Sequence, residues 1–191
     1  MAIKDLGIDE NWTLFLDRDG VINHKLPDDY VKNIQEFQFI QYSAEAVAEL
    51  GKIFGRVLIV TNQQGIGKRL MTDKDLELVH NHMMEVLREA GGRIDKIYQC
   101  PHLVAENSEY RKPEIGMALK AKEDFPEIDF SRSLMVGDSL SDLQFGRNAG
   151  MKTVWVSGYR SKLNDDFIEN ADFIVTDLRE LANRIKKKRD A

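Results

Sequence analysis

The sequence predicts an α/β protein in which a mostly parallel sheet is flanked by helices on both faces. Short β-rich apolar runs alternate with longer stretches of helical periodicity. Most of these runs are apolar throughout, which is typical of strands buried on both faces. No repeat or Gly/Ser-rich linker divides the 191 residues, so we expect a single domain over 1–191.

The expected strands cover residues 12–17, 56–61, 96–100, 133–137, 152–156 and 173–175. The expected helices cover 43–54, 72–90, 114–125, 140–149 and 177–188. The helix over 72–90 has the clearest boundaries, because Thr72 and Asp75 match a capping box and two glycines follow at 91–92. In such sheets ligands bind beyond the carboxyl ends of the strands, so polar residues directly after strands are the functional candidates.

Composition and charge exclude several classes of protein. Apolar residues make up 42% of the chain and charged residues 31%, which is a balanced globular composition. The net charge of -5 disfavours a nucleic-acid partner. No apolar run approaches the ~18 residues that span a bilayer, and the N-terminus lacks the pattern of a signal peptide. With the single Cys100, which permits no internal disulfide, these features predict a cytoplasmic protein. The expected assembly is a monomer or a weak oligomer.

Two acids, Asp17 and Asp19, follow the first strand directly. Carboxylates this close to an apolar strand are costly to bury unless a cation meets them, and Mg²⁺ would do so. A turn with two solvated aspartates is the alternative interpretation. An EF-hand is excluded because Gly20 is not at the sixth loop position and a strand precedes the acids.

The second strand ends in the polar run Thr-Asn-Gln-Gln over 61–64. A turn of this kind can offer the Thr61 hydroxyl and backbone N–H groups to phosphate oxygens, although an ordinary polar turn would look the same. The run over 65–69 only superficially resembles a P-loop. Asn62 stands where that motif needs its first glycine, and Arg69 where it needs Ser or Thr.

Lys112 lies in the run Arg-Lys-Pro over 111–113, where the proline disfavours helical backbone at the lysine and suits the start of the next helix. A solvated basic pair is the alternative. After the fourth strand come Asp138, Ser139 and, within the next helix, Asp142. Helix capping by Asp138 or Ser139 is compatible with a metal role for the acids.

Four successive elements thus bring Asp-x-Asp, Thr, Lys and Asp to one edge of one sheet. In this combination the chain resembles the haloacid dehalogenase (HAD) superfamily of phosphatases from about residue 12 to 176. The strings LDRDGVIN, VTNQQGIG, CPH, RKPEIGM and VGDSLSD are similar to its branch of heptose-bisphosphate and histidinol-phosphate phosphatases. The four superfamily motifs correspond to Asp17 with Asp19, Thr61, Lys112, and Asp138 with Asp142.

The resemblance implies a Rossmann-like fold and a phosphomonoester hydrolase with an aspartyl-phosphate intermediate on Asp17. Asp19 would act as general acid and then as general base. Mg²⁺ would be held by the carboxylates of Asp17 and Asp138 and by the backbone carbonyl of Asp19. Lys112 would neutralise the phosphoryl oxygens, and Thr61 with backbone N–H groups would complete the cradle.

The segments between these motifs are filled by the expected helices and strands, so we expect no cap domain. Specificity would then come from the loops over 23–30 and 100–112. The expected substrate is a small phosphorylated metabolite, a heptose bisphosphate that loses the phosphate on its primary carbon, with histidinol phosphate as the alternative. The expected substrate contacts are Lys25, Asp28, Asn62, Gln64 and Arg111.

Related phosphatases carry zinc on Cys-x-His followed by Cys-x-Cys, whereas here Cys100 and His102 are followed by no further cysteine. Closed zinc sites usually take four ligands, so no structural zinc is expected. A phospho-accepting receiver domain is the non-enzymatic alternative, but its acceptor follows an interior strand and its acidic pair is not separated by a residue such as Arg18. A sugar phosphomutase is disfavoured because its chemistry benefits from a closing cap that excludes water.

Overall fold

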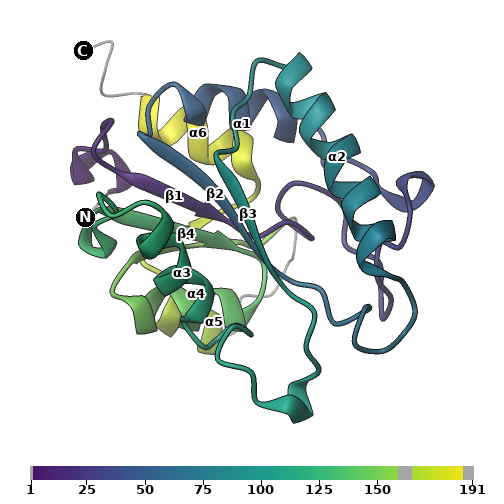
Figure 1. Ribbon diagram of the computed structural model, residues 1–191. Helices are drawn as coiled ribbons and strands as arrows, with labels where there is room; N and C mark the ends of the chain where they lie inside the picture. The colour runs from purple at the N-terminus through teal and green to yellow at the C-terminus, as the bar shows by residue number, and fades with distance from the viewer. Residues whose placement is uncertain (1, 159–164, 187–191) are drawn as a thin grey trace.

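The protein is described here by a computed structural model, which covers residues 2–158 and 165–186. One sheet contains six parallel strands in the order β3-β2-β1-β4-β5-β6 (Figure 1). The strands are β1 (Thr13–Leu16), β2 (Arg56–Asn62), β3 (Lys96–Cys100), β4 (Ser133–Gly137), β5 (Lys152–Val156) and β6 (Phe173–Val175). All six predicted strands are confirmed, with differences of one residue at the ends of β1 and β2.

The strand order places the direction change of the sheet beside β1. From β1 the chain moves outward through β2 to β3, and then returns to β4 on the other side of β1. Leu16 is in register with Val136, and the amide of Asp17 donates to the carbonyl of Val136 at 2.9 Å. A crevice at such a switch point is where open α/β sheets bind their ligands. Asp17 and Asp138 follow the two strands that border it.

Helices cover both faces of the sheet (Figure 1). Neighbouring residues of β1 enter different cores, because Leu14 and Leu16 pack on one face and Phe15 on the other, each with no exposed surface. This confirms the expectation of strands buried on both sides. One layer holds α1 (Ser43–Gly51), α2 (Asp73–Glu89) and α6 (Leu178–Lys186), and the other holds α3 (Gly116–Asp124), α4 (Leu140–Ala149) and α5 (Asp165–Asn170).

The predicted helix boundaries are confirmed for α4 and differ elsewhere by a few residues. α1 ends at Gly51, three residues early, and α3 begins at Gly116, whose amide donates to the carbonyl of Glu109 at 2.8 Å and so belongs to a turn. The short helix α5 was not predicted, because six residues are too few to show a helical period. Of the predicted helix over 177–188, residues 187 and 188 lie outside the described residues.

The capping box predicted for α2 is present. The Thr72 amide donates to Oδ2 of Asp75 at 2.8 Å, and the Asp75 amide donates to Oγ1 of Thr72 at 3.2 Å. Each side chain therefore satisfies a backbone N–H that the first turn of the helix leaves unpaired.

The connections between the first three strands contain no cap domain. Between β1 and β2 the chain forms only α1 and the 3₁₀ turn η2 (Ile34–Glu36), and between β2 and β3 it forms α2. The other 3₁₀ turns are η1 (Ile3–Leu6), η3 (Val104–Glu106) and η4 (Phe130–Arg132). Within 2–158 and 165–186, no helix combines the length and the apolar character that a membrane crossing requires.

Candidate active site

The centre of the site is an ion pair between Asp17 and Lys112. Asp17 follows β1 and is 7% exposed, and its Oδ1 accepts a hydrogen bond from Nζ of Lys112 at 2.8 Å. The same ammonium lies 2.6 Å from Oδ1 of Asp142 and donates to the carbonyl of Val60 at 2.7 Å. These three contacts match the three donors of an ammonium group, so the position of Lys112 is fully specified.

The electrostatics of this centre favour a further cation. Burial, opposed by the charge of Lys112 and reinforced by the charges of Asp142 and Asp138, raises the pKa of Asp17 to about 7. Although burial opposes the charged form of Lys112, the carboxylates of Asp142 and Asp17 raise its pKa above its ordinary value. One ammonium thus faces several carboxylates, and a positive ion beside Asp17 would favour its ionised form.

Three carboxylates form a cluster suited to such an ion. Asp17, Asp138 and Asp142 each offer one oxygen, and these oxygens lie within 4.8 Å of one another. Two glycines permit this approach, because a Cβ at Gly20 would lie 2.5 Å from the Asp138 carboxyl and a Cβ at Gly137 would lie 2.1 Å from the Asp142 side chain. An all-oxygen donor set with several negative charges is the chemistry that Mg²⁺ prefers, so the residues present fit this ion.

Asp142 serves two purposes, a role that the sequence did not decide. Its Oδ2 accepts from the amide of Ser139 at 3.0 Å, which completes a capping box at the start of α4, while its Oδ1 contacts Lys112. Its place at the third helical position was the available signal, because that position points back to the end of the preceding strand. Asp138 lies 3.3 Å from the ammonium of Lys25, whose side chain is 54% exposed.

Asp19 is held by three neighbouring side chains. Nη2 of Arg18 donates to both of its oxygens, at 2.9 and 2.8 Å. Asn23 donates to one oxygen and Gln63 to the other, each at 2.8 Å. Burial raises the pKa of Asp19, but the charge of Arg18 and these hydrogen bonds outweigh that effect and hold the pKa below its ordinary value. The side chain is 21% exposed and borders the same cleft as Asp17.

The end of β2 supplies further parts of the site. The amide nitrogen of Gln63, which binds Asp19, also donates to Oγ1 of Thr61 at 2.9 Å. Asn62 forms two hydrogen bonds of 3.1 Å with the backbone of Lys112, so it positions the lysine as well as bordering the cleft. We did not select Gln63 from the sequence. The signal was the two-residue period of a strand, which gives Thr61 and Gln63 the same direction.

The expected site residues surround two adjoining cavities. Asp138 borders a cavity of about 850 Å³, which Lys25 and Asp28 share. The other cavity is a cleft of about 590 Å³, which Ser139 and Ser141 of the β4–α4 turn also border. The lining of this cleft includes Asp17, Asp19, Lys25, Asp28, Thr61, Asn62, Gln64, Arg111 and Lys112.

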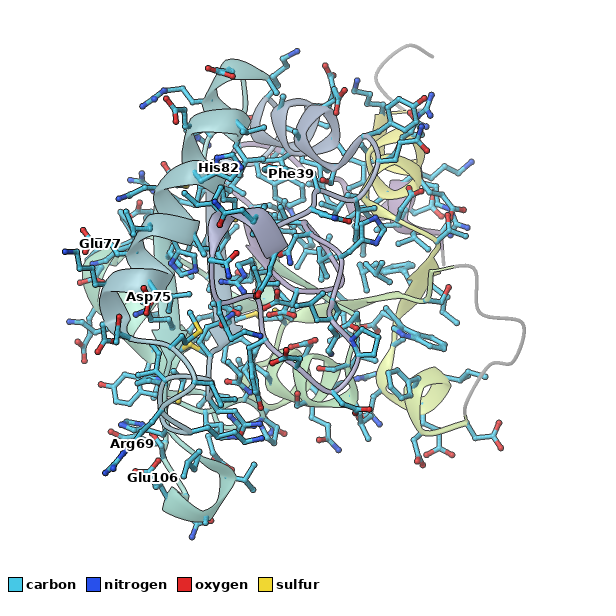
Figure 2. The ribbon with its side chains drawn as sticks, turned by 90° about the vertical axis from the view of Figure 1, so that its right-hand side faces the viewer. Phe39, Arg69, Asp75, Glu77, His82 and Glu106 are labelled. Carbon is cyan, nitrogen blue, oxygen red and sulfur yellow. The ribbon has the colours of Figure 1, made fainter. Side chains whose placement is uncertain are left out.

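The loops after β2 and β3 meet at one end of the molecule, where Figure 2 labels Arg69 and Glu106. They are joined where the amide of Gly67 donates to the carbonyl of Pro101 at 3.2 Å.

The cysteine and histidine of the zinc pattern stand where the second of these loops begins, with Cys100 as the last residue of β3 and His102 in the loop. Nδ1 of His102 lies 3.7 Å from Sγ of Cys100 and 2.7 Å from Oγ of Ser108. Arg111 holds the loop from its other end, because Nη1 donates to the carbonyl of His102 at 3.2 Å. Hydrogen bonds therefore connect the two ends of this loop. The expectation of no structural zinc stays a prediction.

Comparison with known proteins agrees with this geometry. A family model described as HAD-hydrolase-like matches residues 109–181. The D-glycero-alpha-D-manno-heptose-1,7-bisphosphate 7-phosphatase of Campylobacter jejuni is 37% identical over 179 residues, which are 92% of this chain and 96% of that protein. The protein of the same name from Mycobacterium bovis is 39% identical over 137 residues, 72% of each chain.

A solved structure shares the whole fold. The crystal structure of D,D-heptose 1,7-bisphosphate phosphatase from B. bronchiseptica, complexed with magnesium and phosphate, has a TM-score of 0.81 and 28% sequence identity. The match covers 94% of this chain and 99% of that one. The chain therefore belongs to the haloacid dehalogenase superfamily of phosphatases. All three relatives named here are heptose-bisphosphate phosphatases.

Proposed function

We propose that this protein removes one phosphate from a heptose bisphosphate, with Asp17 as the nucleophile. The observation that carries the proposal is the ion pair of 2.8 Å between Asp17 and Lys112, placed at the switch point of the sheet and open to a cleft of about 590 Å³. Its substrate class is supported by 37% identity to the heptose-bisphosphate phosphatase of Campylobacter jejuni over nearly the full length of both chains.

The carboxylates of Asp17, Asp138 and Asp142 would hold Mg²⁺, together with the backbone carbonyl of Asp19 that the family resemblance implies. When bound, Mg²⁺ supplies positive charge between the nucleophile and the anionic substrate. The need for it is electrostatic, because two unit charges 4 Å apart repel by roughly 4 kcal/mol at an effective dielectric of 20. Lys112 supplies further positive charge at the same place, and Thr61 offers a hydroxyl to the phosphoryl group.

In the first step a carboxylate oxygen of Asp17 forms a bond to phosphorus, and the bond from phosphorus to the sugar oxygen breaks. Lys112 orients the attacking carboxylate and favours its ionised form, which burial alone disfavours. Asp19 donates a proton to the leaving alkoxide, a contribution typically worth 10²- to 10⁴-fold. The approach of the substrate's negative charge raises the pKa of Asp19 and so favours the protonated form that this step needs.

In the second step Asp19 takes a proton from a water molecule, which attacks the phosphorus of the aspartyl-phosphate and releases Asp17. The hydrogen bonds from Arg18, Asn23 and Gln63 favour the ionised carboxylate that a general base requires. The same residue thus acts in both steps, with its protonation state set by the charge beside it.

The cleft suits a polyhydroxylated substrate with a second phosphate. Lys25, Lys68 and Arg111 border it in addition to Lys112, and Arg111 is held in place by the carbonyl of His102. An arginine can pair with a phosphate through two parallel hydrogen bonds, so Arg111 is our choice for the second phosphate, with Lys25 as the other candidate. Gln64, whose amide donates to the hydroxyl of Tyr30 at 2.7 Å, offers hydrogen bonds to sugar hydroxyls.

Histidinol phosphate is the second candidate, because Asp28 and Asp29 also border the cleft and could pair with its ammonium group. The test compares kcat/KM for heptose 1,7-bisphosphate and histidinol phosphate on the same preparation. We expect the bisphosphate to be preferred and Arg111→Ala to raise its KM, while Arg88→Ala on exposed α2 surface leaves KM unchanged. A tenfold preference for histidinol phosphate, or an unchanged KM in Arg111→Ala, would count against the substrate.

The nucleophile is tested separately. Asp17→Asn is nearly isosteric and removes the attacking charge, so it should fold and lose essentially all turnover. Retention of more than about a tenth of the wild-type kcat, a barrier change of only ~1.4 kcal/mol, would contradict the covalent mechanism.

A further inference from the structure

Arg18 separates the two catalytic aspartates in the sequence and has no exposed surface. Removing a guanidinium from water is expensive, and the expense is offset only by close partners of suitable charge and geometry. A residue at this position needs no charge to form the turn. The partners of Arg18 therefore indicate what the buried charge does.

The guanidinium joins Asp19 to a histidine on a different layer of the protein. Nη2 donates to both oxygens of Asp19, and Nη1 lies 3.1 Å from Nε2 of His80, which belongs to α2. Within the described residues Nε has no hydrogen-bond partner. Two contacts through adjacent nitrogens define the plane of the guanidinium, and that plane defines how the Asp19 carboxylate is presented.

His80 must accept this hydrogen bond, because arginine has donors only. Its Nε2 is therefore unprotonated, and the ring proton lies on Nδ1. The surroundings support a neutral ring, since burial and the charge of Arg18 lower the pKa of His80 to about 3. His80 thus presents a fixed acceptor to Arg18 throughout the neutral pH range.

We propose that His80 is a positioning residue for catalysis, which orients the Asp19 carboxylate through Arg18. The inference rests on the proposed role of Asp19 as general acid and base. Loss of the His80 contact leaves Arg18 free to rotate about its bonds to Asp19, while Asn23 and Gln63 still hold the carboxylate from their side. The expected effect is therefore a displaced rather than a released carboxylate, and a displacement of about 1 Å can lower turnover by about 10²-fold.

The same helix offers a matched control. His82 is two residues from His80 and packs edge-on against Phe37, with ring centroids 6.1 Å apart. Figure 2 shows His82 on the side of α2 that faces Phe39, whereas Glu77 points outward from the helix. A substitution at His82 thus shows the effect of losing a half-buried histidine from α2 while the contact between His80 and Arg18 is kept.

The first experiment compares His80→Leu, His80→Gln and His82→Leu by steady-state kinetics on the phosphorylated substrate, with thermal unfolding in parallel. His80→Leu should lower kcat by about 10- to 100-fold and change KM by less than about threefold. His80→Gln should keep kcat within about threefold of wild type, because the Gln amide oxygen can replace Nε2 as the acceptor. His82→Leu should leave kcat unchanged.

Rescue by glutamine separates positioning from packing. Equal losses in His80→Leu and His80→Gln, or an unchanged kcat in His80→Leu, would overturn the inference. If His80→Leu is too unstable to assay, His80→Asn replaces it, because its shorter amide cannot reach Nη1, and the same low kcat is expected.

The second experiment adds Asp19→Asn and completes a double-mutant cycle. If His80 acts by orienting Asp19, His80→Leu should lower kcat by less than about twofold once Asp19→Asn is present. A full multiplicative loss in the double variant would overturn the positioning role and leave the proposed function intact. Wild-type turnover by Asp19→Asn alone would instead refute the role of Asp19, so the two failures are distinguishable.

Discussion

Replacement of Lys112 by methionine tests the electrostatic account of the site most directly. The change keeps the length of the side chain and removes an ammonium that lies 2.8 Å from Asp17 and 2.6 Å from Asp142, in a side chain that is 2% exposed. Removing one partner of a buried ion pair typically costs 3–5 kcal/mol, because the remaining charge stays buried without compensation. For Lys112→Met we therefore expect the free energy of unfolding to fall by about 3–5 kcal/mol at pH 8 without metal.

The assay is urea denaturation in the presence of EDTA, with the free energy of unfolding extrapolated linearly to water. Lys120→Met is the matched control, because Lys120 forms an exposed pair of 3.0 Å with Glu123, and such pairs contribute about 0.2–1 kcal/mol. Adding Asp142→Asn to Lys112→Met should recover at least about 1 kcal/mol, since one uncompensated carboxylate is removed. A loss below about 1 kcal/mol in Lys112→Met, or no recovery in the double variant, would refute the reasoning.

Three further predictions concern pH, metal content and helix capping. The pKa of His80 is lowered from 6.5 to about 3 in the folded protein. Between pH 6.5 and pH 3 the histidine therefore binds a proton only in the unfolded chain, and the free energy of unfolding falls as the pH drops through this range. In the wild type this effect lowers the free energy of unfolding by about 2 kcal/mol at pH 5, and in His80→Gln this pH-dependent decrease should be absent. A plot of unfolding free energy against pH that runs parallel to that of the wild type would contradict the prediction. Activity should require Mg²⁺, and elemental analysis should find far less than one zinc per chain, whereas a stoichiometric zinc would show that the loop at His102 was misinterpreted. Thr72→Ala should lower the free energy of unfolding by about 1 kcal/mol and Thr72→Ser by much less, as measured by urea denaturation.

Much of the fold and most of the site follow from local patterns in the sequence. Strands buried on both faces read as nearly continuous apolar runs, so β1, β2 and β4 were recognisable without knowledge of their neighbours. The polar residues that follow them stand out against those runs. Because parallel strands end at the same edge of a sheet, Asp17 after β1 and Asp138 after β4 could be assigned to one edge, and the resemblance to the HAD motifs added Lys112 from the loop after β3. The capping box at Thr72 is equally local, since it depends on residues three positions apart.

The partners that set the chemistry of each group were decided only by the tertiary structure. His80 follows Arg18 by 62 residues, and neither belongs to a pattern that predicts the other. Asp142 contacts Lys112 because α4 begins beside the switch point, and Gln63 reaches Asp19 because β2 lies next to β1. Local patterns indicate the direction in which Asp142 and Gln63 point but not the partner that either one binds, because a hydrogen bond depends on distances of a few ångströms between atoms, and separation along the chain does not determine those distances.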